Sequence, residues 1–164
     1  MKASCTSTVV VALFLFGCGG ASSGGSTPEA VAKGIAAAYS NGDAKAAIAL
    51  LPSDEAFKAA WDCPADARLA KRLTRRRDRA EKEFSKAKEK GVSMSVKSFT
   101  AEPKNTKVVK KGEKYKGCTA KVEVTIQKHR LTLLIKADGK EKDDGATWKF
   151  AKFGDNATWY FFKL

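Results

Sequence analysis

The hydrophobic pattern of the chain changes at Gly91. Before this glycine, apolar residues recur at helical spacing in segments separated by capping residues and turns. After it, apolar and polar residues alternate over 92–96, 122–126 and 131–133, and further apolar strands follow at 148–150 and 159–161. Helices followed by strands that short turns connect predict an α+β fold with an antiparallel sheet.

Four helices are expected before Gly91. The first starts at Thr27-Pro28-Glu29, with a hydroxyl cap and a proline at the first position, and stops at Asn41-Gly42. A short helix over 44–51 ends at Pro52, and a third starts at Ser53 and carries Phe57 and Trp61. A longer helix is expected from Pro64 to about Lys90. The domain therefore divides into helices over about 28–90 and strands over about 92–164.

The last strand, 158–162, is apolar on both faces. A strand of this kind needs cover on both sides, so we expect it to lie centrally in the sheet. Helices would then cover one face, and a cavity, a bend or a partner would lie against the other. A completely filled two-sided core is the alternative.

The first residues have the features of an export signal. Lys2 precedes an apolar run over 9–16 that is too short to span a bilayer but fits a secretory leader. The run ends in Leu15-Phe16-Gly17-Cys18, which resembles the lipobox of bacterial lipoproteins. The resemblance implies a signal peptide over 1–17, acylation (as by palmitate) of Cys18 and a Gly/Ser tether over 18–27. Gly19 resembles the pattern of outer-membrane sorting, and a plain signal peptide is the alternative.

Two other segments resemble a known fold. Residues 35–52, with Asn41-Gly42-Asp43 between two helices, look like the first helices of nuclear-transport-factor-2-like domains, a cystatin-like α+β cone. The segment from Gly145 to Trp159 is similar to the closing strands of its small lipoprotein branch of unknown function. Isomerases and cyclases of that superfamily use a Tyr and an acid at places that Ile35 and Ala59 hold here. The resemblance therefore implies the fold without the isomerase chemistry.

The rest of the sequence offers little for catalysis. His129 is the only histidine, and we expect it at a strand end, where Lys128 and Arg130 would disfavour its protonation. Acidic residues over 138–144 alternate with lysines and fit a solvated hairpin better than a calcium site. No phosphate-binding glycine loop follows a strand. We therefore expect no enzyme activity, no cofactor and no metal.

The lipoprotein resemblance also bears on the cysteines. If Cys5 leaves with the signal peptide and Cys18 carries lipid, Cys63 and Cys118 remain, and outside the cytoplasm they form a natural disulfide pair. Free thiols or a redox site are the alternative, although no Cys-x-x-Cys motif supports them.

The segment from Arg68 to Lys90 carries eleven cations and four acids, in a chain whose net charge is +13. Its apolar residues fall within one narrow arc of a helix, so most of the helix should remain solvated: Leu69, Leu73, Ala80, Phe84 and Ala87. Three interpretations compete: a solvated face with internal ion pairs, a contact surface for anionic headgroups or envelope polymer, and a nucleic-acid surface. An exported, lipidated protein argues against nucleic acid. The candidate anionic contacts are Arg72, Arg75, Arg76, Arg77 and Arg79.

On the same helical wheel, Arg76 lies next to the apolar arc and must pair, extend to solvent or enter a cavity. A pocket lined by Tyr39, Arg76, Trp148 and Trp159 is expected if the cone is open, with Arg76 or Arg77 holding an anionic ligand. The sequence thus predicts a lipid-anchored, extracytoplasmic binding or scaffolding protein, on the outer membrane or the cell surface. Its partners would be the membrane and an anionic envelope polymer or a protein. A cone that binds or converts a small molecule is the alternative.

Overall fold

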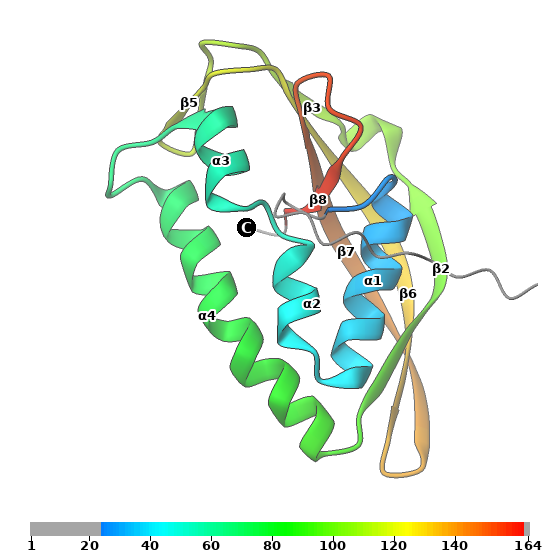
Figure 1. Cartoon of the computed structure of the whole chain (residues 1–164). Helices are drawn as coiled ribbons and strands as arrows, with labels where there is room; N and C mark the ends of the chain where they lie inside the picture. Colours follow the sequence, from blue (N-terminus) through cyan, green and yellow to red (C-terminus); the bar gives the residue numbers. More distant parts are fainter. Residues whose placement is uncertain (1–23, 163–164) are drawn as a thin grey trace, which may run out of the picture.

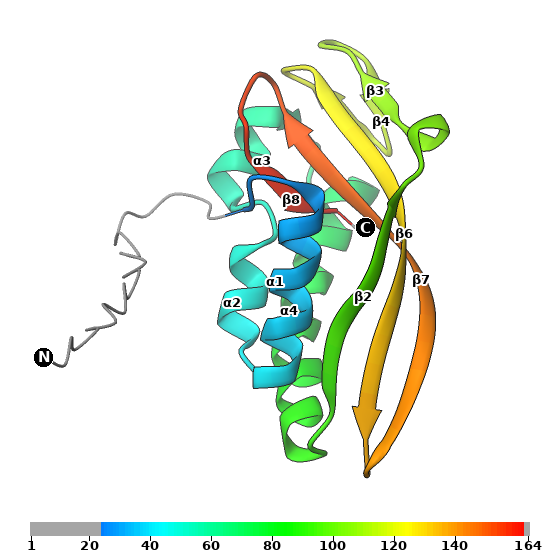
Figure 2. The same ribbon diagram turned by 90° about the vertical axis from the view of Figure 1, so that its right-hand side faces the viewer.

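The computed structural model describes residues 24–162, with only the backbone of Pro103. It has α+β architecture with antiparallel sheets, as the change of period at Gly91 predicted. The helices α1 (Pro28–Asn41), α2 (Ala44–Ala49) and α4 (Arg68–Glu89) lie together in front of the large sheet (Figure 1). Seen from the side, helices and sheet form two layers, and the strands bend along their length (Figure 2).

The helix boundaries follow the capping residues. The side chains of Thr27, Asp43 and Ser53 accept hydrogen bonds from backbone amides in the first turns of α1, α2 and α3 (Asp54–Ala60). Gly42 ends α1 with a φ of 64°, in the left-handed region that glycine adopts most easily.

Two expectations about the helices are wrong in detail. Trp61 does not continue α3: it begins the two-residue strand β1 (Trp61–Asp62), which pairs with β5 (Cys118–Ala120). The long helix begins at Arg68 rather than Pro64, because the preceding residues form a turn in which the amide of Ala67 donates to the carbonyl of Pro64.

The large sheet has the order β2-β6-β7-β8, and β3 also pairs with β6. Its strands are β2 (Ser93–Ala101), β3 (Lys107–Val109), β6 (Val124–Ala137), β7 (Lys140–Phe153) and β8 (Trp159–Phe161). A 3-10 turn, η1 (Pro103–Asn105), follows β2. A second, three-stranded sheet has the order β1-β5-β4, in which β4 is Lys114–Tyr115.

Strand β6 joins two segments that the sequence pattern separates. The buried residues are even-numbered at the start of the strand, Val124 and Ile126. From His129 onward they are odd-numbered, and Leu131 and Leu133 follow. The pairing with β7 is unbroken from Val124–Phe153 to Ala137–Lys140, so no bulge causes this change. A single strand therefore turns one face to the core over its first residues and the opposite face over the rest.

Strand β8 is covered on both faces, but its expected central position is wrong. Tyr160 stacks on Phe153 at 5.2 Å, while Phe161 packs edge-on against Trp148 at 5.0 Å. Within the described sheet β8 pairs with β7 alone. Its outer edge is closed by Gly25, which exchanges two backbone hydrogen bonds with Trp159, and by the carbonyl of Leu50, which accepts from the amide of Phe161. Backbone from the N-terminal segment and α2 thus takes the place of a second neighbouring strand.

Candidate functional site

Helix α4 divides into an apolar side and a basic side. Its buried residues are the five that the sequence pattern selected, from Leu69 to Ala87, so the narrow apolar seam is confirmed. At about 100° per residue, seven cations fall within an arc of about 80° on another side of the helix. All of them are exposed except Arg72, which is half-buried. We call this set the basic stripe: Arg68, Arg72, Arg75, Arg79, Lys82, Lys86 and the capping residue Lys90.

No acidic residue of α4 lies within the arc of the basic stripe. The stripe also extends along the whole helix, which at about 1.5 Å per residue is a length of about 33 Å. Asp78, Glu83 and Glu89 flank the stripe at i,i+3 or i,i+4 spacing, but the seven cations outnumber the four acids of α4, so this side of the helix keeps a net positive charge.

Two of the five arginines expected at this surface lie elsewhere. The guanidinium of Arg77 forms an ion pair with Asp54 and donates to the carbonyl of Pro52, which fastens α4 to the start of α3. The hydrogen bond from Arg77 to Asp54 lowers the pKa of the Asp54 carboxyl. Arg76 lies at a cavity, with its guanidinium carbon 5.8 Å from the centre of the Phe161 ring.

The cavity at Arg76 has a volume of about 160 Å³ and lies between α1, α2, α4 and the sheet. Tyr39, Arg76 and Trp148 line it, as expected, whereas Trp159 does not. Trp159 instead holds the sheet edge at Gly25. Arg76, Glu83 and Tyr39 are the polar lining groups, and the others are apolar: Ile35, Ala47, Leu51, Ala80, Phe84, Met94, Trp148 and Phe161.

The lining determines what the cavity can bind. Tyr39 packs edge-on against Phe84 at 5.3 Å, and Trp148 packs in the same way against Phe161, so the walls are aromatic and rigid. The Arg76 guanidinium beside such walls suits a small molecule with an apolar body and one anionic group, whereas the Glu83 carboxylate on the same lining opposes the anionic group. Ile35, at the place of the isomerases' tyrosine, lines the cavity, and Ala59 is exposed on α3.

His129 does not lie at a strand end, as expected, but in the middle of β6, where it is buried. Its ring stacks on Phe99 at 4.6 Å and meets Phe150 edge-on, and Nε2 lies 3.2 Å from Gln127 Oε1. Burial is the main cause that lowers its pKa, and Glu102 acts in the opposite direction. Desolvation, and not the neighbouring cations that were expected, therefore lowers the pKa of His129. His129 is a core residue.

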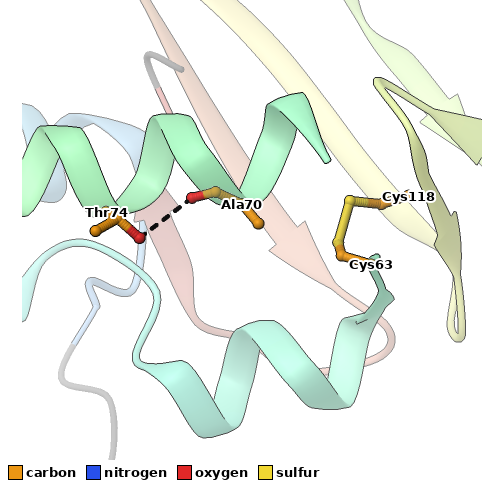
Figure 3. The surroundings of a disulfide bond; sticks show 4 residues. All are labelled: Cys63, Ala70, Thr74 and Cys118. Carbon is orange, nitrogen blue, oxygen red and sulfur yellow. Dashed lines mark hydrogen bonds between the residues drawn. A yellow bond between two sulfur atoms is a disulfide. The ribbon is translucent and has the colours of Figure 1, made fainter. Parts of the chain in front are cut away.

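Cys63 and Cys118 form a disulfide that joins the end of β1 to β5, close to the first turns of α4 (Figure 3). The two cysteines are 55 residues apart in sequence, and their Cα atoms are 4.3 Å apart. The bond thereby links two neighbouring strands of the small sheet, and Cys63 lies five residues before the first residue of α4.

Cations from separate segments lie close to Tyr115, next to this disulfide, and the sequence pattern did not predict their proximity. The ammonium groups of Lys107 and Lys116 lie 5.0 and 5.4 Å from the ring centre of Tyr115. Burial lowers the pKa of Lys116, and Lys149, Arg72 and Arg68 lower it further. The sequence signal was an aromatic residue between lysines, Lys114-Tyr115-Lys116-Gly117, which is weak without knowledge of the strands that surround it.

Comparison with known proteins gives no match: no family model, no curated protein and no solved structure is detectably similar to this chain. Over residues 24–162, no helix is both long and apolar enough to cross a membrane. In that same part of the chain, His, Cys, Asp and Glu side chains form no group of three that could hold a metal ion. The expected leader over 1–17 and the expected acylation site, Cys18, lie outside the described residues.

Proposed function

We propose that this chain is a lipid-anchored protein of the bacterial cell envelope and that the basic stripe of α4 binds an anionic surface, without catalysis. The lipobox resemblance at Cys18 supports the anchor. The single observation that carries the binding role is the continuous exposed stripe on a helix whose apolar seam is fully used in the core. The proposal includes the nuclear-transport-factor-2-like cone, which the helix layer and the bent antiparallel sheet support.

The anchor would hold the stripe close to a membrane. The fold begins at Gly24, whose amide donates to the carbonyl of Ala49 at 3.2 Å. Five residues lie between Cys18 and Gly24, and the six steps along the chain, at about 3.5 Å each, reach at most about 20 Å. The domain would therefore remain within a few nanometres of the bilayer to which Cys18 is attached, either at the outer membrane or at the cell surface.

Electrostatics supports an anionic partner of this surface. Each Lys or Arg near a negative membrane surface contributes about 1 kcal/mol, an effect that salt screens. Several stripe cations can approach one plane together because they project from one side of a straight helix. The same charges would also bind an anionic envelope polymer. Binding to the membrane requires a bilayer, whereas binding to the polymer does not.

The experiment compares binding to neutral phosphatidylcholine vesicles with binding to vesicles that also contain phosphatidylglycerol. The full chain carries Cys18→Ser, so that neither an acyl group nor the leader contributes to the difference between the two vesicles. The stripe variant replaces Arg75, Arg79, Lys82 and Lys86 with Gln. The control variant removes four exposed cations from other surfaces: Lys45, Lys58, Lys140 and Lys142.

The stripe variant should lose about 1,000-fold in affinity for the anionic vesicles, the equivalent of four contacts of about 1 kcal/mol each, and the control variant much less. Equal losses in the two variants would mean that net charge alone causes binding, and the proposal would then be wrong. The anchor has its own test: labelled fatty acid should appear on the exported chain and be absent after Cys18→Ser.

The cavity favours a second candidate function, the binding of a small amphipathic anion. Because Trp148 lines the cavity, a ligand inside it should change tryptophan fluorescence. Titration with short aromatic and aliphatic carboxylates tests this function, with Arg76→Gln expected to weaken binding and Arg75→Gln, which is outside the cavity, as the matched control. A fluorescence response that is the same in both variants would exclude the cavity as the site.

A further inference from the structure

The β4–β5 turn holds a lysine in an unfavourable backbone conformation. Lys116 and Gly117 form the two-residue connection between Tyr115 and Cys118, with φ angles of 50° and 86°. The left-handed conformation costs a residue with a side chain about 1–2 kcal/mol, and the preferred sequence for such a turn is Asn-Gly. The other tight hairpin, at Asp138-Gly139, follows that preference. Lys116 therefore contributes a charge where backbone energetics favour a different residue.

The other cations reach this turn from three separate elements. Gly117 packs against the start of α4, since a Cβ built on it would lie 3.6 Å from the Cβ of Ala67 and 3.7 Å from the amide nitrogen of Arg68. Lys107 extends from β3 over the ring of Tyr115. Lys149 on β7 and Arg72 on α4 are close enough to Lys116 to affect its titration. We call this set the Tyr115 cluster: Lys107 and Lys116, which lie over the half-buried ring, and Arg68, Arg72 and Lys149, which act on the charge of Lys116.

The like charges repel one another in the folded protein. The pKa of Lys116 lies below its ordinary value, first because of burial and then because of Lys149, Arg72 and Arg68. An anion that neutralises several of these cations at once would therefore stabilise the cluster.

The entrance of α4 adds to the positive potential. Ala67 at the cap position has no side chain that could accept from the first amides of α4, unlike Thr27, Asp43 and Ser53 at the other helices. The positive end of the helix dipole therefore faces the same region as the cations of the cluster.

We propose that the Tyr115 cluster binds a phosphomonoester group on a membrane headgroup. The inference rests on the proposed function, because the basic stripe would bring the cluster to the membrane, and Arg68 and Arg72 belong to both. A phosphomonoester carries a charge of about −1.5 to −2 and three acceptor oxygens, whereas a phosphodiester carries a single charge. A compact group of five cations from four elements can use the larger charge, while an extended stripe gains equally from either headgroup.

The disulfide maintains the geometry of this site. Cys118 directly follows the turn, and its bond to Cys63 holds the turn beside the entrance of α4 (Figure 3). Without the bond, only the pairing of β1 with β5 and the packing of Gly117 on Ala67 would hold Lys116 near Arg68 and Arg72. The preference for phosphomonoesters should therefore be sensitive to reduction.

The experiment compares two anionic vesicles of equal measured surface charge, one with phosphatidic acid, a monoester, and one with phosphatidylglycerol, a diester. The full chain with Cys18→Ser is tested beside two double variants. The cluster variant is Lys116→Asn with Lys149→Gln, in which asparagine suits the turn and protects folding. The matched control, Lys86→Gln with Lys90→Gln, removes the same charge from the far end of the basic stripe.

The unsubstituted chain should prefer phosphatidic acid by about fivefold or more, the equivalent of about one additional cation contact. The cluster variant should lose this preference, and the control variant should keep it while binding both vesicles more weakly. Reductant should weaken the preference. Competition by inorganic phosphate at equal ionic strength distinguishes the sources: if free phosphate at low millimolar concentration removes the preference for phosphatidic acid, the site serves a soluble phosphate and the headgroup assignment is wrong.

Failure of this inference is distinct from failure of the proposed function. Equal affinity of the unsubstituted chain for the two vesicles, with salt-sensitive binding to both, overturns the phosphomonoester site and leaves the basic stripe intact. Absence of binding to either anionic vesicle overturns both proposals.

Discussion

Arg77 and Asp54 form an ion pair that connects the middle of α4 to the first residue of α3. The same guanidinium donates to the carbonyl of Pro52, so Arg77 serves the fold although it stands in a run of three arginines. Its neighbours Arg75 and Arg79 are exposed on the basic stripe. Arg77 thus stabilises the fold, whereas Arg75 and Arg79 belong to the basic stripe. Single substitutions can distinguish these two roles.

Arg77→Gln should lower the free energy of unfolding by about 1–2 kcal/mol, because a charge-assisted hydrogen bond to a carbonyl is lost together with a partly exposed ion pair. Arg75→Gln should change stability little but weaken binding to anionic vesicles more than Arg77→Gln does. Urea unfolding and vesicle sedimentation of the two variants measure both effects. A larger loss of stability in Arg75→Gln, with a larger loss of vesicle binding in Arg77→Gln, would contradict this division of roles.

The disulfide should contribute a large part of the stability. The chain-entropy estimate for linking residues 55 positions apart is about 4 kcal/mol. Reduction of the native protein, followed by blocking of the thiols, should therefore shift the urea midpoint strongly downward, and Cys63→Ser with Cys118→Ser should reproduce the shift. An unchanged midpoint in reductant would show that the bond adds nothing to folding.

The burial of His129 predicts a pH dependence of stability. Burial lowers its pKa in the folded protein, so the unfolded chain binds a proton at a higher pH than the folded protein does. Stability is then complete above the ordinary histidine pKa of about 6.5 and falls as the pH decreases through that value.

Because His129 is the only histidine, His129→Phe should flatten the dependence of unfolding free energy on pH between about 7.5 and 5.5. Phenylalanine can keep the stacking on Phe99. Chemical denaturation at several pH values measures the slope. A slope that persists in the variant would assign the dependence to carboxyl groups.

Lys116→Asn should make the protein more stable while weakening its preference for phosphatidic acid. Asparagine tolerates the left-handed backbone, and the substitution removes one of several mutually repelling cations. The expected gain is about 1 kcal/mol, or an increase of about 3 °C in the melting temperature. Lys114→Asn, in β4 beside the turn, is a control that removes the same charge without the backbone gain. A decrease in melting temperature would contradict the account of this turn.

The sequence predicted those features that depend on local pattern. The helix caps at Thr27, Asp43 and Ser53, the apolar seam of α4 and the turn at Asp138-Gly139 follow from side-chain chemistry within a few residues. The pairing of Cys63 with Cys118 followed from counting cysteines in a chain that was expected to be exported.

The errors come from distant parts of the chain. The buried positions of β6 are even-numbered up to Ile126 and odd-numbered from His129, which made one strand look like two in the sequence. The position of β8 depends on Gly25 and Leu50, neither of which the strand's own sequence can indicate. In the same way, the Tyr115 cluster assembles residues from β3, the β4–β5 turn, α4 and β7, so no single segment contains its pattern.

The pairing of Gly25 with Trp159 has a mechanical consequence. A tension applied at the N-terminal end of the chain meets the fold first at this pair and at the bond from Gly24 to Ala49. The load then passes to β8 and from there to β7, across backbone bonds at the sheet edge. An envelope protein pulled by its anchor would therefore begin to peel at β8, which contains only three residues, before the long β6–β7 hairpin carries any strain.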